Sequence, residues 1–151
     1  MADVPSAYRM DRGLSDEARA ALEANVNATI GTLNPDGSVH LAHVSFLYED
    51  GRLYFETASS TRKARNAAER PRVSFLVDHP EIDVRAEGRA RVLIGPEAQA
   101  VNQRLREKYG FGAKADRYFR SIDDCAVEIS VDRWRTWKNV RLRQEIRETQ
   151  T

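Results

Sequence analysis

Hydroxyl groups and positive charges gather in one short segment of the chain, residues 57–66, which read TASSTRKARN. The segment follows the apolar run Leu53–Phe55 and precedes residues of helical character that end before Pro71. Backbone N–H groups at a helix start carry partial positive charge, and nearby hydroxyl and cationic side chains favour a phosphate. We therefore expect a phosphate-binding turn, with an exposed cap and a solvated basic face as the alternative. The candidate groups are Ser59, Ser60, Thr61, Arg62, Lys63 and Arg65.

The overall composition limits the partners of such a site. The chain has 151 residues, of which 41% are hydrophobic and 31% charged, as is typical of one globular domain. Its formal net charge is only +1, which gives no general attraction to nucleic acid or to an anionic membrane. Aromatic residues also do not alternate with the basic ones along any predicted strand. We therefore expect no nucleic-acid or membrane partner, and a small anionic ligand for the local basic cluster.

A single cysteine, Cys125, excludes an intramolecular disulfide and fits a reducing compartment. It begins the apolar run CAVEISV, so a buried packing role is favoured over a catalytic thiol. The first residues, MADVPS, lack the basic start and apolar stretch of a signal peptide, and no apolar segment has the length of a membrane span. These features predict a cytoplasmic protein.

The hydrophobic pattern predicts one mainly β domain over residues 1–151, with a loose arm at 1–13 and a polar tail at 138–151. Turn signals join neighbouring period-two runs as hairpins, so the strands are expected to be antiparallel; they are NPDG at 34–37 and EDG at 49–51. Strands are expected over residues 28–33, 39–48, 53–57, 73–77, 84–93 and 126–131, and helices over 14–25, 61–69, 96–109 and around 118–119. These elements favour a small antiparallel barrel or sandwich with helices at its ends.

Local features refine these predictions. Ser15 is the expected N-cap of the first helix, because Asp16 and Glu17 suit its first turn. Gly88 interrupts a regular alternation in the strand 84–93, which predicts a bulge or a close neighbour. The expected inner face of the helix at 96–109 consists of Ala100, Val101, Leu105 and Tyr109, and the last strand is expected to be followed by Trp134 and Trp137.

Several well-known catalytic and metal-binding patterns are absent. The sequence contains no GxSxG nucleophile motif, no GxxxxGK[ST] phosphate loop and no GxGxxG dinucleotide motif. His40 and His43 lie three residues apart on a predicted strand and so point to opposite faces. His79 lies near Glu81 and Asp83, where a surface turn is favoured over a metal ligand. No metal site is therefore predicted.

The order of these features resembles the pyridoxamine 5′-phosphate oxidase-like superfamily of split β-barrel flavin and deazaflavin proteins. The residues that carry the resemblance are the NPDG hairpin, the third strand, the hydroxyl-rich turn with Arg62 and Lys63, and the following NAAERPRVSFLVD. The resemblance is strongest over 28–94 and weaker over the second half. It implies an antiparallel split β-barrel of the FMN-binding-protein type, with about six strands and short helices. It also implies a homodimer with two cofactor sites at the subunit interface.

The same resemblance implies roles for individual residues. Positions that match the family's phosphate-binding turn are Thr57, Ser60, Thr61, Arg62 and Lys63, extended by Arg65 and Asn66. Positions that match the strand lying along the tricyclic ring are His43, Val44 and Ser45, and the other subunit is expected to complete the pocket through Trp137. No residue is assigned as catalytic; the candidates for proton donation are His43, Tyr48 and Tyr109, or water.

The family divides by cofactor, and some members hold FMN while a large actinobacterial group uses the deazaflavin F420. Short length, the KARN segment and the arginine-rich composition are more similar to the F420 group. An F420-dependent oxidoreductase acting on a small unsaturated organic substrate is therefore expected. An FMN enzyme of the same fold and a non-catalytic carrier or tetrapyrrole-binding barrel remain alternatives. Oxidation of pyridoxamine phosphate is not expected, because the C-terminal arginine-histidine motif of those oxidases is missing.

Overall fold

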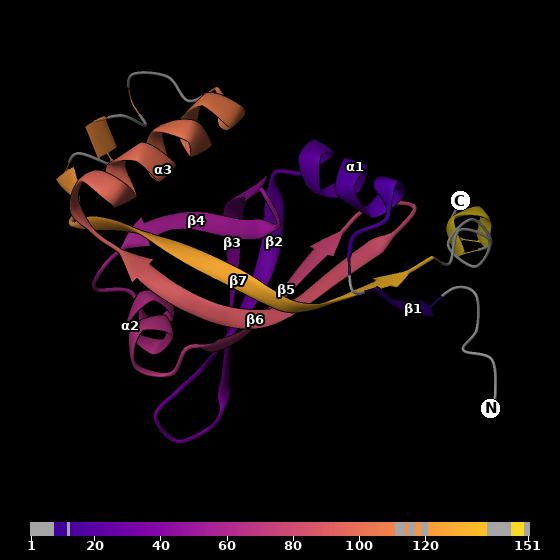
Figure 1. Cartoon of the computed structure of the whole chain (residues 1–151), viewed down its shortest axis with the longest axis horizontal. Helices are drawn as coiled ribbons and strands as arrows, with labels where there is room; N and C mark the ends of the chain where they lie inside the picture. The colour runs from indigo at the N-terminus through magenta and orange to yellow at the C-terminus, as the bar shows by residue number, and fades with distance from the viewer. Residues whose placement is uncertain are drawn as a thin grey trace.

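The structure, a computed structural model, describes residues 8–11, 13–110, 114, 117, 118, 121–138 and 146–149. Its strands are β1 (Tyr8–Asp11), β2 (Asn27–Leu33), β3 (Val39–Glu49), β4 (Arg52–Ala58), β5 (Arg72–Asp78), β6 (Asp83–Leu93) and β7 (Asp124–Trp137). Its longer helices are α1 (Asp16–Ala24), α2 (Arg62–Glu69) and α3 (Gly95–Tyr109). The strands form the body of the molecule, and the helices lie around it (Figure 1).

The strands close into an antiparallel barrel. Their order is β1-β7-β4-β3-β2-β5-β6, and an additional pairing of β6 with β7 joins the ends of the six strands β2 to β7. β7 is 14 residues long: its first half pairs with β4, and its second half pairs with β1 while β6 runs along both halves. This arrangement confirms the predicted mainly β, antiparallel split-barrel fold.

A glycine allows the long seam between β6 and β7 to close. The register of this pair shifts between Glu87 and Gly88, where the extra residue of a bulge lies on β7. A Cβ atom on Gly88 would lie 2.2 Å from the carbonyl oxygen of Ser130, so no other residue fits without moving the backbone. The bulge and the close neighbour predicted at this glycine are both confirmed.

The interior of the barrel contains the main hydrophobic core. Phe46, Phe55 and Phe75 lie within it, and Phe46 and Phe75 meet edge to face with ring centroids 5.4 Å apart. α1 adds Leu22 and two alanines to this core and α2 adds Ala67, from opposite sides of the barrel (Figure 1). A second, smaller cluster lies outside the barrel, where α3 covers β4 and β7.

The inner face of α3 differs from the prediction. The buried residues are Ala98, Val101, Asn102 and Leu105, whereas Ala100 is exposed. Ala98 rather than Ala100 continues the i, i+3, i+4, i+7 stripe, and two alanines in one helix do not show which of them faces inward. Gly110 ends the helix in the left-handed conformation, with φ of 64°.

Two other boundaries differ from the prediction. Residues 8–11, expected as part of a loose arm, form β1 and pair with β7. β7 extends through Trp134 and Trp137, which were expected to follow the strand. Trp134 and Thr136 are buried and alternate with polar residues, but the polar residues between the tryptophans made this part of the strand difficult to recognise in the sequence. Phe119, expected in a short helix, lies outside the described residues, while its neighbour Tyr118 is helical.

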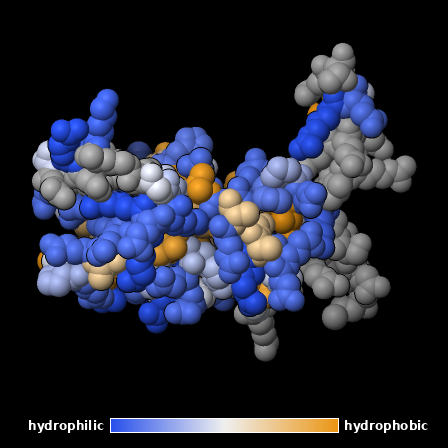
Figure 2. All heavy atoms as spheres, turned by 90° about the horizontal axis from the view of Figure 1, so that it is seen from above, coloured by the Kyte–Doolittle hydropathy of each residue, from blue (hydrophilic) through white to orange (hydrophobic). Residues whose placement is uncertain are grey.

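The surface seen from above is mostly hydrophilic, with hydrophobic residues in small separate patches (Figure 2). Within the described part of the chain, no helix combines the length and the apolar character that crossing a membrane requires.

Candidate functional site

The predicted phosphate turn connects β4 to α2, and Thr61 is the N-cap of this helix. Its side-chain oxygen accepts a hydrogen bond from Ala64 N at 3.4 Å, and its hydroxyl donates to Ala58 O at 2.9 Å. The hydroxyl of Thr57 lies 3.1 Å from that of Thr61 and so ties the strand end to the cap. The backbone N–H groups of Arg62 and Lys63, which follow the cap, have no partner inside the helix. The first turn also contains no acidic residue. The helix start is therefore suited to an anion.

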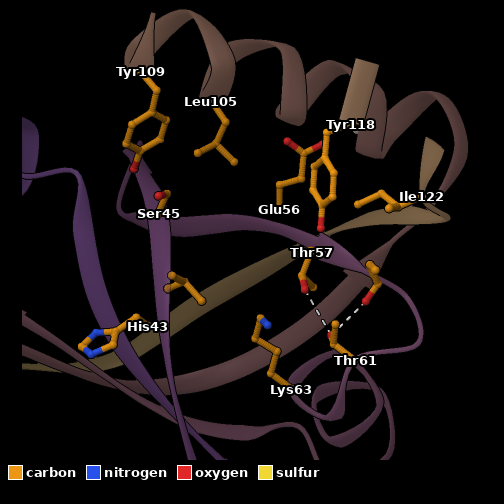
Figure 3. Close-up of a pocket in the computed structure, with 12 residues that line it drawn as sticks. His43, Ser45, Glu56, Thr57, Thr61, Lys63, Leu105, Tyr109, Tyr118 and Ile122 are labelled. Carbon is orange, nitrogen blue, oxygen red and sulfur yellow. Dashed lines mark hydrogen bonds between the residues drawn. The ribbon is translucent and has the colours of Figure 1, made fainter. Parts of the chain in front are cut away.

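A pocket of about 270 Å³ lies beside this helix start (Figure 3). β3, β4 and the beginning of α2 form one wall, and α3 with Tyr118 and Ile122 forms the other. The lining residues are His43, Val44, Ser45, Glu56, Thr57, Ala58, Thr61, Lys63, Leu105, Tyr109, Tyr118 and Ile122. The pocket thus brings together two groups of predicted residues that lie about fifteen positions apart in the sequence.

The pocket lies where β3 and β4 separate. Their pairing runs only from Glu49 opposite Arg52 to Phe46 opposite Phe55. Phe46 N donates to Val26 O on the β2 side, and alternate residues of a strand direct their backbone groups to opposite sides. The backbone groups of His43 and Ser45 therefore point to the side that β4 has left. This is the backbone edge expected to lie along the ring of a bound cofactor.

Lys63 provides the free positive charge of the pocket. Its side chain extends from α2 into the pocket (Figure 3), and no carboxylate of the described residues pairs with it. Partial burial lowers the pKa of its amino group, and the neighbouring Cys125 opposes this shift. A half-buried ammonium group is costly to leave without an anionic partner, so Lys63 is suited to hold an anion that enters the pocket.

Glu56 is a charged group of the pocket that the sequence analysis did not single out. Its side chain is 6% exposed and lies under α3, where Arg106 binds it through contacts of 2.6 and 3.3 Å. Arg106 also contacts Asp124 at 3.3 Å. Burial, and next a hydrogen bond with Asp124, raise the pKa of Glu56 to about 7 against the opposing effect of Arg106. No local signal marked this glutamate, because its burial depends on the distant helix α3.

Other predicted residues do not line the pocket. Ser60 and Arg65 are exposed on the turn and on the outer side of α2. Arg62 is exposed and borders a separate hollow with Asp36 and His40. The predicted pair of cations is therefore divided, and only its lysine lies in the pocket.

Asn66 is fully buried and connects α2 to the barrel. Its amide donates to Thr32 Oγ1 at 3.1 Å and to Asn34 Oδ1 at 2.9 Å, and its carbonyl oxygen accepts from Arg70. These contacts give the residue a structural task behind the site. Trp137 lies at the far end of β7, beside β1 and Asp83 of β6, so its proposed place in the pocket of another subunit stays a prediction.

The three candidate proton donors have different surroundings. Tyr48 is away from the pocket and packs edge to face on Trp134, with ring centroids 6.0 Å apart. The hydroxyl oxygen of Tyr109 lies 2.5 Å from the carbonyl oxygens of Val26 and Phe46, and burial raises its pKa to about 12, so it keeps its proton at neutral pH. His43 lines the pocket and is exposed.

The remaining chemical groups give no second centre. Cys125 is a free, buried thiol whose pKa is raised chiefly by burial, in agreement with a packing role. Over the part of the chain that the structure describes, no three histidine, cysteine or acidic side chains come together in a way that could hold a metal ion.

The barrel and its pocket define the class of this protein. Residues 14–138 match the profile of the pyridoxamine 5′-phosphate oxidase family, and the chain therefore belongs to this family. No curated protein matches the chain significantly.

Solved structures of the same fold support this assignment. The conserved hypothetical protein Rv2991 from Mycobacterium tuberculosis is 27% identical, with a TM-score of 0.69 over 85% of this chain and 87% of that one. An F420 reductase is 18% identical, with a TM-score of 0.65 over 80% and 98%. An FAD-binding protein from Mesorhizobium loti is 21% identical, with a TM-score of 0.59 over 85% and 97%. The chain thus shares its fold with proteins named an F420 reductase and an FAD-binding protein.

Proposed function

We propose that the protein is an F420-dependent oxidoreductase that transfers a hydride between the deazaflavin and a small unsaturated organic substrate. The observation that carries this proposal is the unpaired ammonium group of Lys63 beside the open start of α2. An FMN enzyme on the same fold is the alternative, since one cation and a helix start suit the phosphate of either cofactor.

The residues present fit such a cofactor. Lys63 and the first N–H groups of α2 would hold its phosphate, and the backbone edge of His43 and Ser45 would hold the polar side of its ring. Leu105 and Ile122 add apolar surface that excludes water. When bound, the cofactor supplies the hydride, and the chain contributes binding, orientation and a dry wall. This division of tasks agrees with the absence of nucleophile motifs from the sequence.

A second copy of the chain belongs to the same proposal. Val39 and Leu41 on the outer face of β3 are 60% and 67% exposed, and they border a groove of about 770 Å³ that also includes Leu33 and Leu76. Large exposed apolar side chains on a flat strand favour an interface. The groove continues along β3 toward His43, so a partner seated there would lie next to the pocket. We expect Leu41→Glu to shift the protein to monomers in analytical ultracentrifugation and to weaken cofactor binding.

A screen by native mass spectrometry tests the proposal. The purified protein is mixed with F420, FMN, FAD and haem, and the bound mass is measured. We expect F420 to bind, and its reduced form to be consumed in the presence of an enone or another activated alkene. Stoichiometric FMN with no F420 would favour the alternative enzyme. Bound ligand without turnover with any acceptor would instead support a carrier.

A further inference from the structure

The pocket contains a carboxyl group that an anion-binding site does not need. Glu56 lies on the outer face of β4, in the pocket wall between the strand and α3 (Figure 3). Its side chain is 6% exposed, so water screens its charge only weakly. An ionised carboxylate at this position would repel the same anions that Lys63 attracts.

Glu56 shares the guanidinium group that neutralises its charge with a second carboxylate. α3 contributes Arg106, β7 contributes Asp124, and α2 contributes Lys63 on the other side of the pocket. Among the residues that the structure describes, the other titratable groups that face the pocket or the carboxyl are Tyr109 and Tyr118, His43 and the buried thiol of Cys125. Two carboxylates therefore share one guanidinium group, so the set of Glu56, Asp124, Arg106 and Lys63 is neutral when all are ionised.

We propose that Glu56 couples anion binding in this pocket to protonation, so that the pocket binds an anionic group more tightly when the Glu56 carboxyl takes up a proton. With Glu56 protonated, the set of four groups is +1, because Asp124 alone then balances Arg106. With Glu56 ionised, the pocket offers an anion no net charge. The inference rests on the proposed function only in requiring that this pocket bind an anion.

The balance of protonation makes this coupling effective near neutral pH. The pKa of Glu56 is raised to about 7, so the carboxyl is divided between its two forms where the protein would work. An anion beside Lys63 raises this pKa further, and by linkage each protonated molecule binds the anion more tightly. Arg106 remains held by Asp124 and by the uncharged oxygens of Glu56, so α3 need not move.

Sulfate is a suitable probe, because its charge does not change between pH 5.5 and 8.5. Its affinity for the whole protein is measured by isothermal titration calorimetry at constant ionic strength, in two buffers of different ionisation enthalpy. We expect the affinity of the wild type for sulfate to be lower at pH 8.5 than at pH 5.5 by a factor of about five or more. Near pH 7, binding should take up a fraction of a proton per anion.

Two variants locate the group that titrates. Glu56→Gln keeps an oxygen for Arg106 but cannot ionise, and it should bind sulfate with little pH dependence and without proton uptake. Glu128→Gln is the matched control: Glu128 is a buried carboxylate on β7 bound by Arg91 and Arg52 outside the pocket, and this variant should retain the wild-type dependence. Proton uptake by the wild type tests the inference even if Glu56→Gln does not fold.

The outcomes separate this inference from the proposed function. A pH dependence that persists in Glu56→Gln would assign the titration to another group of the pocket and overturn the inference. Sulfate affinity that is constant with pH, or absent at pH 5.5, would also overturn it. Sulfate binding with proton uptake but no binding of F420 or FMN would leave the inference intact and remove the proposed function. Cofactor binding without proton uptake would overturn the inference and leave the proposed function intact.

Discussion

The starts of α1 and α2 have almost the same backbone geometry but opposite charges. Ser15 caps α1 with φ and ψ of −65° and 158°, and Thr61 caps α2 with −68° and 154°. Each side-chain oxygen accepts a hydrogen bond from the N–H group three residues later. In α1, the first turn then contains Asp16 and Glu17, which complement the positive end of the helix dipole.

The first turn of α2 contains Arg62 and Lys63 instead, and no acidic residue. Two cations beside the positive end of a helix are unfavourable by roughly 0.3–1 kcal/mol each. Acidic residues of the first turn therefore complement the N-terminus of α1, whereas no acidic residue of the first turn complements that of α2. The two helix starts share their capping geometry and differ in the charges of the first turn, and we expect this difference to decide which of them binds a ligand.

Removing the free ammonium group should have the largest effect. Lys63→Ala should weaken binding of F420, or of FMN if that is the cofactor, by roughly 10- to 100-fold, since a charge-assisted contact contributes about 1.5–3 kcal/mol. Fluorescence titration measures the affinity. Arg65→Ala removes an exposed cation from the same helix outside the pocket and should change it little. Equal losses in both variants would mean that general positive charge, rather than the pocket lysine, attracts the ligand.

The second largest effect should be a pH-dependent difference in the free energy of unfolding between the wild type and Glu56→Gln. The acids of the α1 start are exposed, but the acid beside the α2 pocket is buried, and its pKa rises from 4.5 to about 7 on folding. Folding therefore favours protonated Glu56, and this stabilisation is present below pH 4.5 and is lost as the pH rises through 7. Relative to wild type, Glu56→Gln should gain on the order of 2 kcal/mol in unfolding free energy between pH 5 and pH 8. Urea unfolding at both pH values measures it, and a difference that does not change with pH would contradict the assignment.

Removing the caps should separate structure from binding. Ser15→Ala and Thr61→Ala should each lower the free energy of unfolding by about 1 kcal/mol, because each leaves one helix N–H group without its partner. Thermal unfolding with and without ligand compares them. Only Thr61→Ala should also reduce the increase in Tm that the cofactor gives. If Ser15→Ala reduced that increase equally, the α2 start would not be the special one.

Exchanging the charges of the first turns should have the smallest effect. Arg62 is exposed and lies outside the pocket, so Arg62→Glu should stabilise the ligand-free protein by about 0.5–1 kcal/mol through the helix dipole. Asp16→Arg should destabilise α1 by a similar amount. Chemical denaturation at low salt measures both, and high salt should reduce both. Effects of the same sign in the two variants would refute the electrostatic comparison.

Much of the architecture was predictable because it is local. The NPDG turn and the glycine turn at Gly51 set the hairpins, and Ser15 could be recognised as a cap from its neighbours. Gly88 also predicted the bulge, because a glycine within an alternating strand leaves space for an approaching backbone. These features depend on residue types within a few positions of one another.

The site was only partly predictable, for two physical reasons. Consecutive residues of a helix are rotated by about 100°, so Arg62 and Lys63 point in different directions. The division of the two cations could therefore have been predicted from the sequence. Glu56 is different, because burial under α3 and next a hydrogen bond with Asp124 raise its pKa, whereas Arg106 opposes this shift. Arg106 and Asp124 lie 50 and 68 positions away in the sequence. No pattern near residue 56 reports which helix will cover it. The roles of Trp137 and of a second subunit stay predictions.

The seam made by β7 has a consequence for the synthesis of the protein. β7 follows every other barrel strand in the chain, yet β4, β6 and β1 all use it as a neighbour. While the chain is still emerging from the ribosome, β4 and β6 therefore have unpaired edges that other nascent chains can join. The barrel can close only after β7 has been synthesised, and a chain that stops before Asp124 would be an aggregation-prone fragment rather than a smaller working protein.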